Sequence, residues 1–379
     1  MLNFYVQILI QWFTFFNQAD IIPKDKKDYG YDFFERTDGG TKVMMFFKGI
    51  GALVLTLAGF SLFTLKCPKG DKAMGGLADA AVATFLVEAI FKYICGDFVG
   101  IAFLGEVGGA SGGMGAVAAA ALAGLAMGTN PVFAIASAAA CSGFGILSGF
   151  IAAYFLHFIL KYTVRYLPAG LDVIVGALLA AGLGRAIATF VDPGVNAVIA
   201  TVGDSISIAT EQSPVMMGIV LGGLMKMICT SPLSSMALTA MLGLTGLPMG
   251  IAAIACFGGS FTNGMIFKRL KFGDNGKVLA VMLEPLTQAD IITKNPLPIY
   301  GSNFFGGAIA GVGAAMLGIV NNAPGTASPI PGMLAPFAFN DPMKVLLALA
   351  IGAVGGTIAG FVGSIVFKKL GFGNAEVPQ

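Results

Sequence analysis

The chain is a succession of apolar runs separated by short polar segments. About 20 apolar residues cross roughly 30 Å of hydrocarbon as a helix, and runs of this length recur along the whole sequence. The pattern therefore predicts an all-α integral membrane protein. The predicted spans cover residues 43–65, 77–95, 171–191, 214–229, 302–321 and 344–367, and a Gly-interrupted helical stretch covers 131–160.

Basic residues between these runs predict how the chain is oriented. By the positive-inside rule, the lysine-rich loop 66–72, the run 268–277 and the pair Lys368-Lys369 are cytoplasmic. The Pro-rich loop 321–342 has no basic residue and is predicted to lie outside. The two spans 302–321 and 344–367 connect the cytoplasmic run 268–277 to the outer loop and back to Lys368-Lys369. Residues 278–301 must therefore enter and leave the membrane from the same side. The sequence thus predicts a re-entrant hairpin at this position.

The predicted hairpin belongs to residues 282–310, MLEPLTQADIITKNPLPIYGSNFFGGAIA. Its prolines interrupt helices because proline lacks a backbone donor. At membrane depth such a backbone must be buried in protein or line a watery cavity, and interrupted segments commonly hold substrate in transporters. Glu284 and Asp290 would then be costly groups retained for a function. The alternative is a solvated cytoplasmic loop that continues the basic run 268–277.

Two further stretches are broken by glycine and proline. Residues 96–130 are Gly-rich around Glu106, which predicts a re-entrant hairpin followed by a span. Residues 230–267 contain a Thr-Ser-Pro break at 230–232 and a Gly-Leu-Pro break at 246–248, which predicts a second broken segment plus a span.

Three segments share a short pattern of four consecutive residues. A polar residue is followed by one with an amide or hydroxyl group, then by proline and by an aliphatic residue. Chance is a competing explanation, but breaks at corresponding places in internal repeats indicate a transporter's site. The segments are Thr129-Asn130-Pro131-Val132, Thr230-Ser231-Pro232-Leu233 and Lys294-Asn295-Pro296-Leu297. Donors and acceptors without a large net charge suit a small hydrophilic solute. The candidate binding residues are Glu284, Asn295, Asn130, Ser231, Glu106 and Asp290.

Other polar residues within apolar runs have structural alternatives. Glu88 and Lys92 are spaced for an ion pair within one helix, which lowers the cost of placing both in a membrane. Arg185 has Asp192 as a possible partner about two turns on. His157 precedes a basic cluster, so it is either an interfacial histidine or a proton-relay or sugar-contact residue.

Composition agrees with a membrane protein and excludes several other classes. Hydrophobic residues make up 56% of the 379 residues and charged residues 11%, against about 25% charged in an average soluble domain. The mean hydropathy is +0.84. A net charge of +2 from scattered residues gives no sign of nucleic-acid binding. Five dispersed cysteines predict neither disulfides nor a metal site, and no motif predicts a cofactor.

The sequence divides into three parts. Residues 1–42 are predicted to be an amphipathic helix, over 1–22, and a polar linker; 43–370 form the membrane domain, and 371–379 a tail. The amphipathic helix has a stripe of polar residues at spacings of three or four. Both a position at the membrane surface and a path across the membrane fit this pattern.

Three segments together resemble the IIC-type membrane components of the sugar phosphotransferase system, in the subgroup that includes the perfringolysin regulator. They are GEVGGASGGMGAVAAAALAGLAMGTNPVFAIASAAA, TSPLSSMALTAMLGLTGLPMG and LEPLTQADIITKNPLPIYGSNFFGGAIAG, and the resemblance covers residues 45–370. These are long Gly/Ala-rich runs without a catalytic signature.

The resemblance implies a homodimeric permease of the cytoplasmic membrane, with about eight to ten membrane helices and re-entrant hairpins. It would move a small, sugar-like solute by an elevator-type, alternating-access displacement. Related permeases bind sugar hydroxyls through a glutamate beside a proline, and Glu284-Pro285 matches that position. IIA and IIB phosphoryl-transfer proteins are the implied partners, and no chemistry is expected in this chain itself.

Two functions follow from the sequence. The first is a permease, and the alternative is a membrane regulator or sensor on the same scaffold that has lost transport. A membrane enzyme lacks support, since no Ser/His/Asp group, metal cluster or phosphate loop stands out. A channel would need a filter-like repeat that the sequence does not show.

Overall fold

The computed structural model describes residues 39–163 and 171–372, and every regular element in these ranges is helical. It confirms the prediction of an all-α integral membrane protein. The predicted helix at 1–22, most of the linker and most of the tail lie outside the described residues.

The first half of the described chain forms α-helices and two π-helical segments, η2 and η3. The bounds are α2 Gly39–Lys66, α3 Gly70–Ala81, η2 Val82–Leu86, η3 Glu88–Phe98, α4 Ala102–Gly112, α5 Gly115–Met127, α6 Pro131–Ala140, α7 Ile146–Thr163 and α8 Leu171–Ala209.

The second half contains α-helices and two short 3₁₀ helices, η5 and η6. The bounds are α9 Pro214–Cys229, α10 Ser235–Met241, α11 Gly246–Leu270, α12 Asn275–Leu283, η5 Pro285–Gln288, α13 Ala289–Lys294, α14 Pro296–Met316, α15 Pro329–Leu334, η6 Ala335–Ala338 and α16 Pro342–Lys369.

Several of these helices are long and apolar enough to cross a membrane. Within the described residues they are Val43–Lys66, Gly70–Asp97, Leu171–Ala209, Gly246–Leu270 and Pro342–Lys369. The helices α4 and α5 are bent by 58° at a short break and would add a sixth span if they act as one. The re-entrant hairpin predicted for this region, and the expected eight to ten helices, remain predictions.

The predicted span at 77–95 belongs to one apolar segment that runs from α3 through the π-helical turns. The predicted ion pair forms there, with Lys92 Nζ 3.0 Å from Glu88 Oε1. Glu88 also packs against α4, because a Cβ at Gly112 would lie 2.1 Å from its Oε2. The pair therefore lies on η3 where this element packs against α4.

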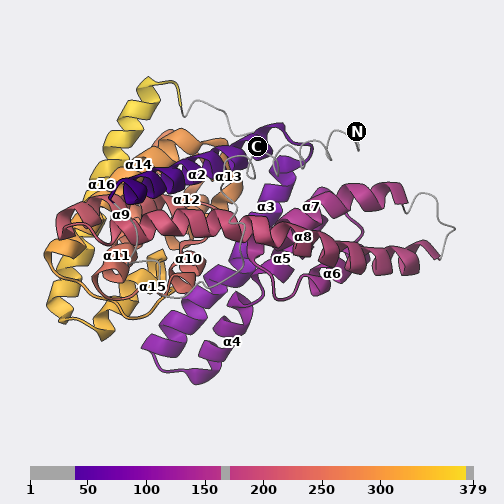
Figure 1. The fold of residues 1–379 in the computed structure, drawn as a ribbon, viewed down its shortest axis with the longest axis horizontal. Coiled ribbons are helices and arrows are strands. Elements are labelled where there is room, and N and C mark those ends of the chain that lie inside the picture. Colours follow the sequence, from indigo (N-terminus) through magenta and orange to yellow (C-terminus); the bar gives the residue numbers. More distant parts are fainter. Residues whose placement is uncertain (1–38, 164–170, 373–379) are drawn as a thin grey trace.

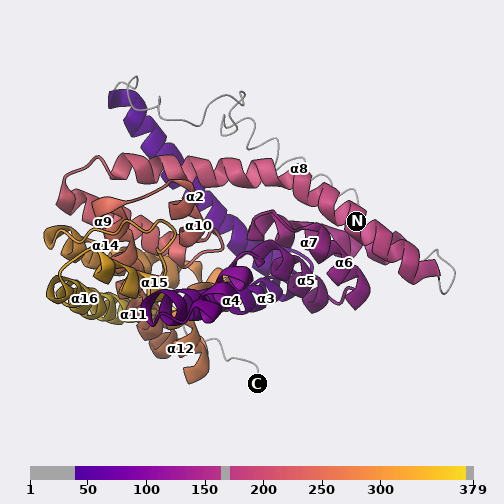
Figure 2. The ribbon, with the colours of Figure 1, turned by 90° about the horizontal axis from the view of Figure 1, so that it is seen from below.

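Helix α8 corrects the sequence prediction for residues 171–213. The polar stretch after residue 191 is predicted to separate two spans. Instead α8 continues through Pro193 and is 39 residues long in total. Asp192 accepts hydrogen bonds from Ser148 Oγ at 2.7 Å and from Asn196 Nδ2 at 2.8 Å. Its polarity is thus satisfied by α7 and by the next turn of α8 itself, without a loop. Figure 2 shows α8 running along much of the length of the molecule.

The proposed Arg185–Asp192 pair also does not form. Arg185 Nη1 donates to the carbonyl oxygens of Ala140 and Ser142 at 2.9 and 2.8 Å, and its guanidinium lies over the ring of Phe144. These carbonyls lie where the 131–160 stretch divides into α6 and α7, with Gly143 at φ 87°. Arg185 therefore satisfies carbonyls that the helix break leaves without partners.

The predicted breaks around residues 230–248 are confirmed. Helix α9 ends at Cys229, just before the Thr-Ser-Pro break, and α11 begins at Gly246 with Pro248 in its first turn. The helix predicted at 302–321 is shifted, because α14 already begins at Pro296 and ends at Met316. It is not among the described helices that are long and apolar enough to cross a membrane. Proline at the first helical position suits a helix start, since its missing N–H has no intrahelical role there.

Helices α9, α11, α14 and α16 pack closely at one end of the molecule (Figure 1). Small residues allow this approach, as is typical of membrane helices. A Cβ at Gly222 would lie 2.5 Å from the Gly307 carbonyl oxygen, and a Cβ at Gly356 would lie 2.0 Å from the Gly258 carbonyl oxygen. The glycine-rich sequence thus builds a tight bundle, against which the broken segment at 275–295 is placed.

Candidate functional site

The broken segment is shaped by local sequence signals. Asp274 Oδ1 accepts a hydrogen bond from Lys277 N and so caps the start of α12. The helix ends before Glu284, which is extended at φ −147° and ψ 104° because Pro285 disfavours helix at the preceding residue. The short helices η5 and α13 follow, and α14 begins at Pro296. The predicted interruption of this segment is confirmed.

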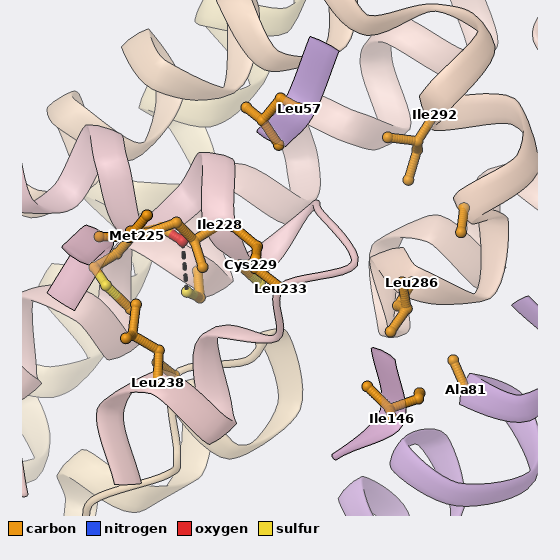
Figure 3. Close-up of a cluster of buried hydrophobic side chains, with 14 of the residues drawn as sticks. Leu57, Ala81, Ile146, Met225, Ile228, Cys229, Leu233, Leu238, Leu286 and Ile292 are labelled. Carbon is orange, nitrogen blue, oxygen red and sulfur yellow. Dashed lines mark hydrogen bonds between the residues drawn. The ribbon is translucent and has the colours of Figure 1, made fainter. Parts of the chain in front are cut away.

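The broken segment is embedded among other helices. Thr64 Oγ1 of α2 donates to Thr293 Oγ1 of α13 at 2.9 Å, and both side chains are buried. Leu286, just after Glu284, lies beside Ala81 and Ile146 in the apolar cluster of Figure 3. These contacts argue against a freely solvated loop, which was the alternative left open by the sequence.

Glu284 is the central polar group of the segment, with only 4% of its surface exposed. Its Oε2 accepts from Ser328 Oγ at 3.0 Å, and its Oε1 accepts from Leu286 N at 3.4 Å. Among the described residues, no Lys, Arg or His nitrogen lies within 4.0 Å of this carboxylate. A carboxylate in such a place is costly, and two hydrogen bonds satisfy only part of its acceptor capacity.

Glu284 lines a small pocket whose other walls come from distant parts of the sequence. Serine hydroxyls face it from the α9–α10 turn and from the segment before α15, and apolar side chains close it. The lining residues are Phe85, Cys229, Ser231, Ser234, Ser235, Met236, Glu284, Leu286 and Ser328. The space has room for about one water molecule. The structure therefore shows a closed pocket that must widen to admit a larger solute.

The α9–α10 turn is held in a fixed shape by its own hydroxyls. Ser231 Oγ donates to the Ile228 carbonyl oxygen at 2.8 Å and accepts from Leu233 N at 3.3 Å. Ser234 has φ 60°, a left-handed conformation that is uncommon for a residue with a side chain. Ser235 Oγ donates to the Ala327 carbonyl oxygen, which ties the turn to the segment of Ser328. The hydroxyls are thus presented on a preformed backbone.

Of the predicted site residues, the pocket brings together Glu284 and Ser231. Asn130 is exposed and caps α6, accepting from Val132 N at 2.9 Å. Asn295 Nδ2 donates to the Ile291 carbonyl oxygen at the end of α13. Glu106 is exposed on α4, and Asp290 is half-buried on α13. These four residues do not line this pocket, so the three Pro-containing motifs do not converge on it.

The sequence analysis missed Ser234, Ser235 and Ser328. The first two follow directly on the Thr-Ser-Pro break, which is a usable signal. Ser328 had none, because it belongs to the loop 321–342 that was predicted to lie outside. In the structure this loop turns back into the protein, and Ser328 is 2% exposed. A loop predicted to lie outside thus meets, at Glu284, the segment predicted to enter from the inside.

His157 belongs to a separate buried cluster. Its Nε2 lies 2.9 Å from Lys69 Nζ, and its Nδ1 lies 2.8 Å from Thr129 Oγ1. Lys69 Nζ also donates to the Met127 carbonyl oxygen. An ammonium group only donates, so Nε2 must accept and the imidazole must be neutral with its proton on Nδ1. His157 thereby joins the start of α3, the α5–α6 turn and α7, and it does not line the Glu284 pocket.

Replacing His157 by phenylalanine is expected to reduce stability without affecting the Glu284 pocket. Lys69 and Thr129 each lose a partner, which costs about 1 to 2 kcal/mol. Thermal unfolding in detergent measures the change. Thr129→Val is the matched variant, and it should add little once His157 is already phenylalanine. Fully additive effects would contradict the hydrogen-bonded unit.

The fold and the site together define a multi-pass helical membrane protein with an interrupted segment around a buried carboxylate. A family model described as "Phosphotransferase system, EIIC" matches residues 71–378. The chain therefore belongs to the EIIC family of the phosphotransferase system and is a IIC-like membrane component. None of the curated proteins or solved structures with which the chain was compared matches it.

Proposed function

We propose that this chain is a permease that moves a small hydrophilic, sugar-like solute across the cytoplasmic membrane. Family membership supports a sugar as the class of solute and IIA and IIB proteins as the general partners. The observation that carries the proposal is the buried Glu284, hydrogen-bonded to Ser328 within a pocket of serine hydroxyls. Carboxylate and hydroxyl oxygens are suitable partners for the hydroxyl groups of a sugar.

An alternating-access movement of the elevator type fits the closed pocket. Its walls come from η2, the α9–α10 turn, the broken segment and the segment before α15, so relative movement of these elements would open it. When these elements move back, the apolar contacts of Leu286 with neighbouring helices would form again and close the pocket. We further propose that the protein is a homodimer and that the broken segments 96–130 and 278–301 are re-entrant hairpins.

Binding and flux measured on the same purified protein test this function. A panel of neutral sugars and sugar alcohols is titrated against the full chain in detergent, and the best ligand is followed into proteoliposomes. The permease predicts saturable binding and solute uptake, with uptake stimulated if IIA and IIB proteins and a phosphoryl donor are added. Binding without uptake, both with and without the IIA and IIB proteins, would favour the regulator or sensor. If no sugar binds, both the permease and the sugar sensor are contradicted.

A further inference from the structure

The pocket around Glu284 is lined by two chemically different sets of side chains. The polar set consists of the Glu284 carboxylate and the serine hydroxyls already described. The apolar set includes Phe85 of η2, Met236 of α10 and Leu286 of η5. Apolar walls with a few placed polar groups are typical of sites for small ligands. A solute that fills the pocket therefore needs an apolar surface as well as hydroxyl groups.

Phe85 is the aromatic side chain of this lining, and it reaches the pocket from the first half of the chain. The other described lining residues lie between Cys229 and Ser328. Phe85 belongs to the π-helical element η2, and π-helical turns are rare and occur frequently at functional sites. Element η2 contacts η5, the turn that directly follows Glu284. The π-helical turn thus places an aromatic ring opposite residues of the second half.

The ring of Phe85 is also supported from outside the pocket. A Cβ at Gly115, the first residue of α5, would lie 3.6 Å from Phe85 Cε1 and 3.7 Å from its Cζ. These are ordinary contact distances, so the edge of the ring lies against α5. One turn before the pocket, Thr84 Oγ1 donates to the Ala80 carbonyl oxygen at 2.7 Å, which ties η2 to the end of α3. The ring is therefore held by its own half of the chain.

A combination of an aromatic ring and hydroxyl groups fits the ring form of a sugar. A sugar ring carries its hydroxyls around the rim and exposes C–H groups on its faces. An aromatic side chain offers a large, rigid apolar surface to such C–H groups, and carboxylate and serine oxygens pair with hydroxyls. An open-chain sugar alcohol has similar hydroxyls but no fixed apolar face. An aromatic residue at position 85 therefore favours a cyclic solute.

The charge of the lining restricts the solute further. Among the described residues that line the pocket, none is basic, and Glu284 is the one carboxylate. A sugar acid or a sugar phosphate would be buried there without a counter-charge, which is costly. The lining thus suits uncharged polyols, and its apolar side chains decide between cyclic and open-chain ones.

We propose that Phe85 is a specificity-determining residue, on whose ring the C–H face of an uncharged, cyclic sugar stacks. The rim hydroxyls of the same sugar bind Glu284 and the serines once the pocket has widened. This inference rests on the proposed function and deepens it, because it states which polyols the site accepts. Removal of the aromatic ring then weakens binding of cyclic sugars and leaves binding of open-chain sugar alcohols almost unchanged.

Titration of the purified full chain in detergent with matched pairs of a hexose and its hexitol tests this inference. Wild type should bind the hexose more tightly by roughly tenfold, the upper range of what one aromatic contact contributes. Phe85→Leu keeps an apolar side chain without the ring, so its affinity for the hexose should fall to that for the hexitol. Its affinity for the hexitol should stay within a factor of about two of wild type. Phe85→Tyr retains an aromatic face and should retain the preference.

Phe91→Leu is the matched control for Phe85→Leu. Phe91 is half-buried on η3 and does not line the pocket, so this variant should have the wild-type affinity for both solutes. A merely structural role of Phe85 would weaken binding of hexose and hexitol equally in Phe85→Leu. That result would overturn the inference, because the ratio of the two affinities would be unchanged.

The solute panel separates a failure of this inference from a failure of the proposed function. If wild type binds and transports hexitols as well as hexoses, the role of Phe85 is overturned and the permease remains. This comparison needs no variant, so it decides the question even if Phe85→Leu folds poorly. If neither hexoses nor hexitols bind, the proposed function is contradicted, and the inference fails with it.

Discussion

Glu284→Gln is expected to abolish solute binding while the protein still folds. Glutamine has nearly the same shape, and its carbonyl oxygen can still accept a hydrogen bond from Ser328 Oγ or from Leu286 N. Glutamine cannot become a carboxylate, however, and hydrogen bonds to a charged group contribute about 1.5 to 3 kcal/mol each. Affinity should therefore fall by roughly a hundredfold or more for two such bonds to solute hydroxyls. Equilibrium titration with the best ligand of the wild-type protein measures the loss.

Asp290→Asn is the matched control for this prediction. It makes the same chemical change six residues later, on a half-buried side chain that does not line the pocket. Its affinity should remain within a factor of about two of wild type, as expected for a change away from the contact surface. If purified Glu284→Gln bound the solute as tightly as wild type, Glu284 would have no place in the site.

Gly222→Ala is expected to destabilise the helix bundle strongly for a change of one methyl group. The new Cβ would lie 2.5 Å from the Gly307 carbonyl oxygen and 3.0 Å from the Gly311 Cα. These are backbone atoms, so α9 and α14 must move apart. Overpacking of this kind costs about 1 to 3 kcal/mol, and the melting temperature in detergent should fall accordingly.

Gly182→Ala provides the comparison, since Gly182 lies within α8 and a Cβ there would meet no atom within 4 Å. Alanine is the better helix former, so this variant should melt at or slightly above the wild-type temperature. Equal losses in the two variants would mean that glycine is needed for helix flexibility, and that close approach of α9 and α14 is not the reason for Gly222.

Local signals explain which parts of the structure were predictable. Apolar runs gave α2, the segment beginning with α3, and α16, because hydropathy acts along a single helix. Pro285, Pro232 and Pro296 marked real helix ends, since proline constrains its own residue and the one before it. Glu284 stood out for the same reason, as an acidic residue beside such a break in an apolar sequence.

Tertiary contacts explain what could not be predicted. The polar stretch 192–213 suggested a separation between two spans, but Asp192 is satisfied by Ser148, 44 residues earlier, and α8 continues. The partner of His157 is Lys69, 88 residues away, and nothing in the local pattern indicates the pair.

The buried Lys226 and Ser328 were hidden in the same way. Lys226 is one charge within an apolar helix, and its burial depends on glycines of α11 and α14. Ser328 reaches Glu284 because the loop before α15 folds inward. Both depend on how segments distant in sequence pack together.

The most direct test of the account is the accessibility of a cysteine at position 328, beside Glu284, in a variant whose five native cysteines are replaced. We predict that Ser328→Cys reacts with a small water-soluble thiol reagent, that bound solute slows this reaction, and that a bulky polymer-linked maleimide does not reach the thiol. Ser213→Cys, on the exposed turn before α9, should react with both reagents. Rapid modification of Ser328→Cys by the bulky reagent, unaffected by solute, would place Glu284 in open solvent and contradict a membrane-embedded binding pocket.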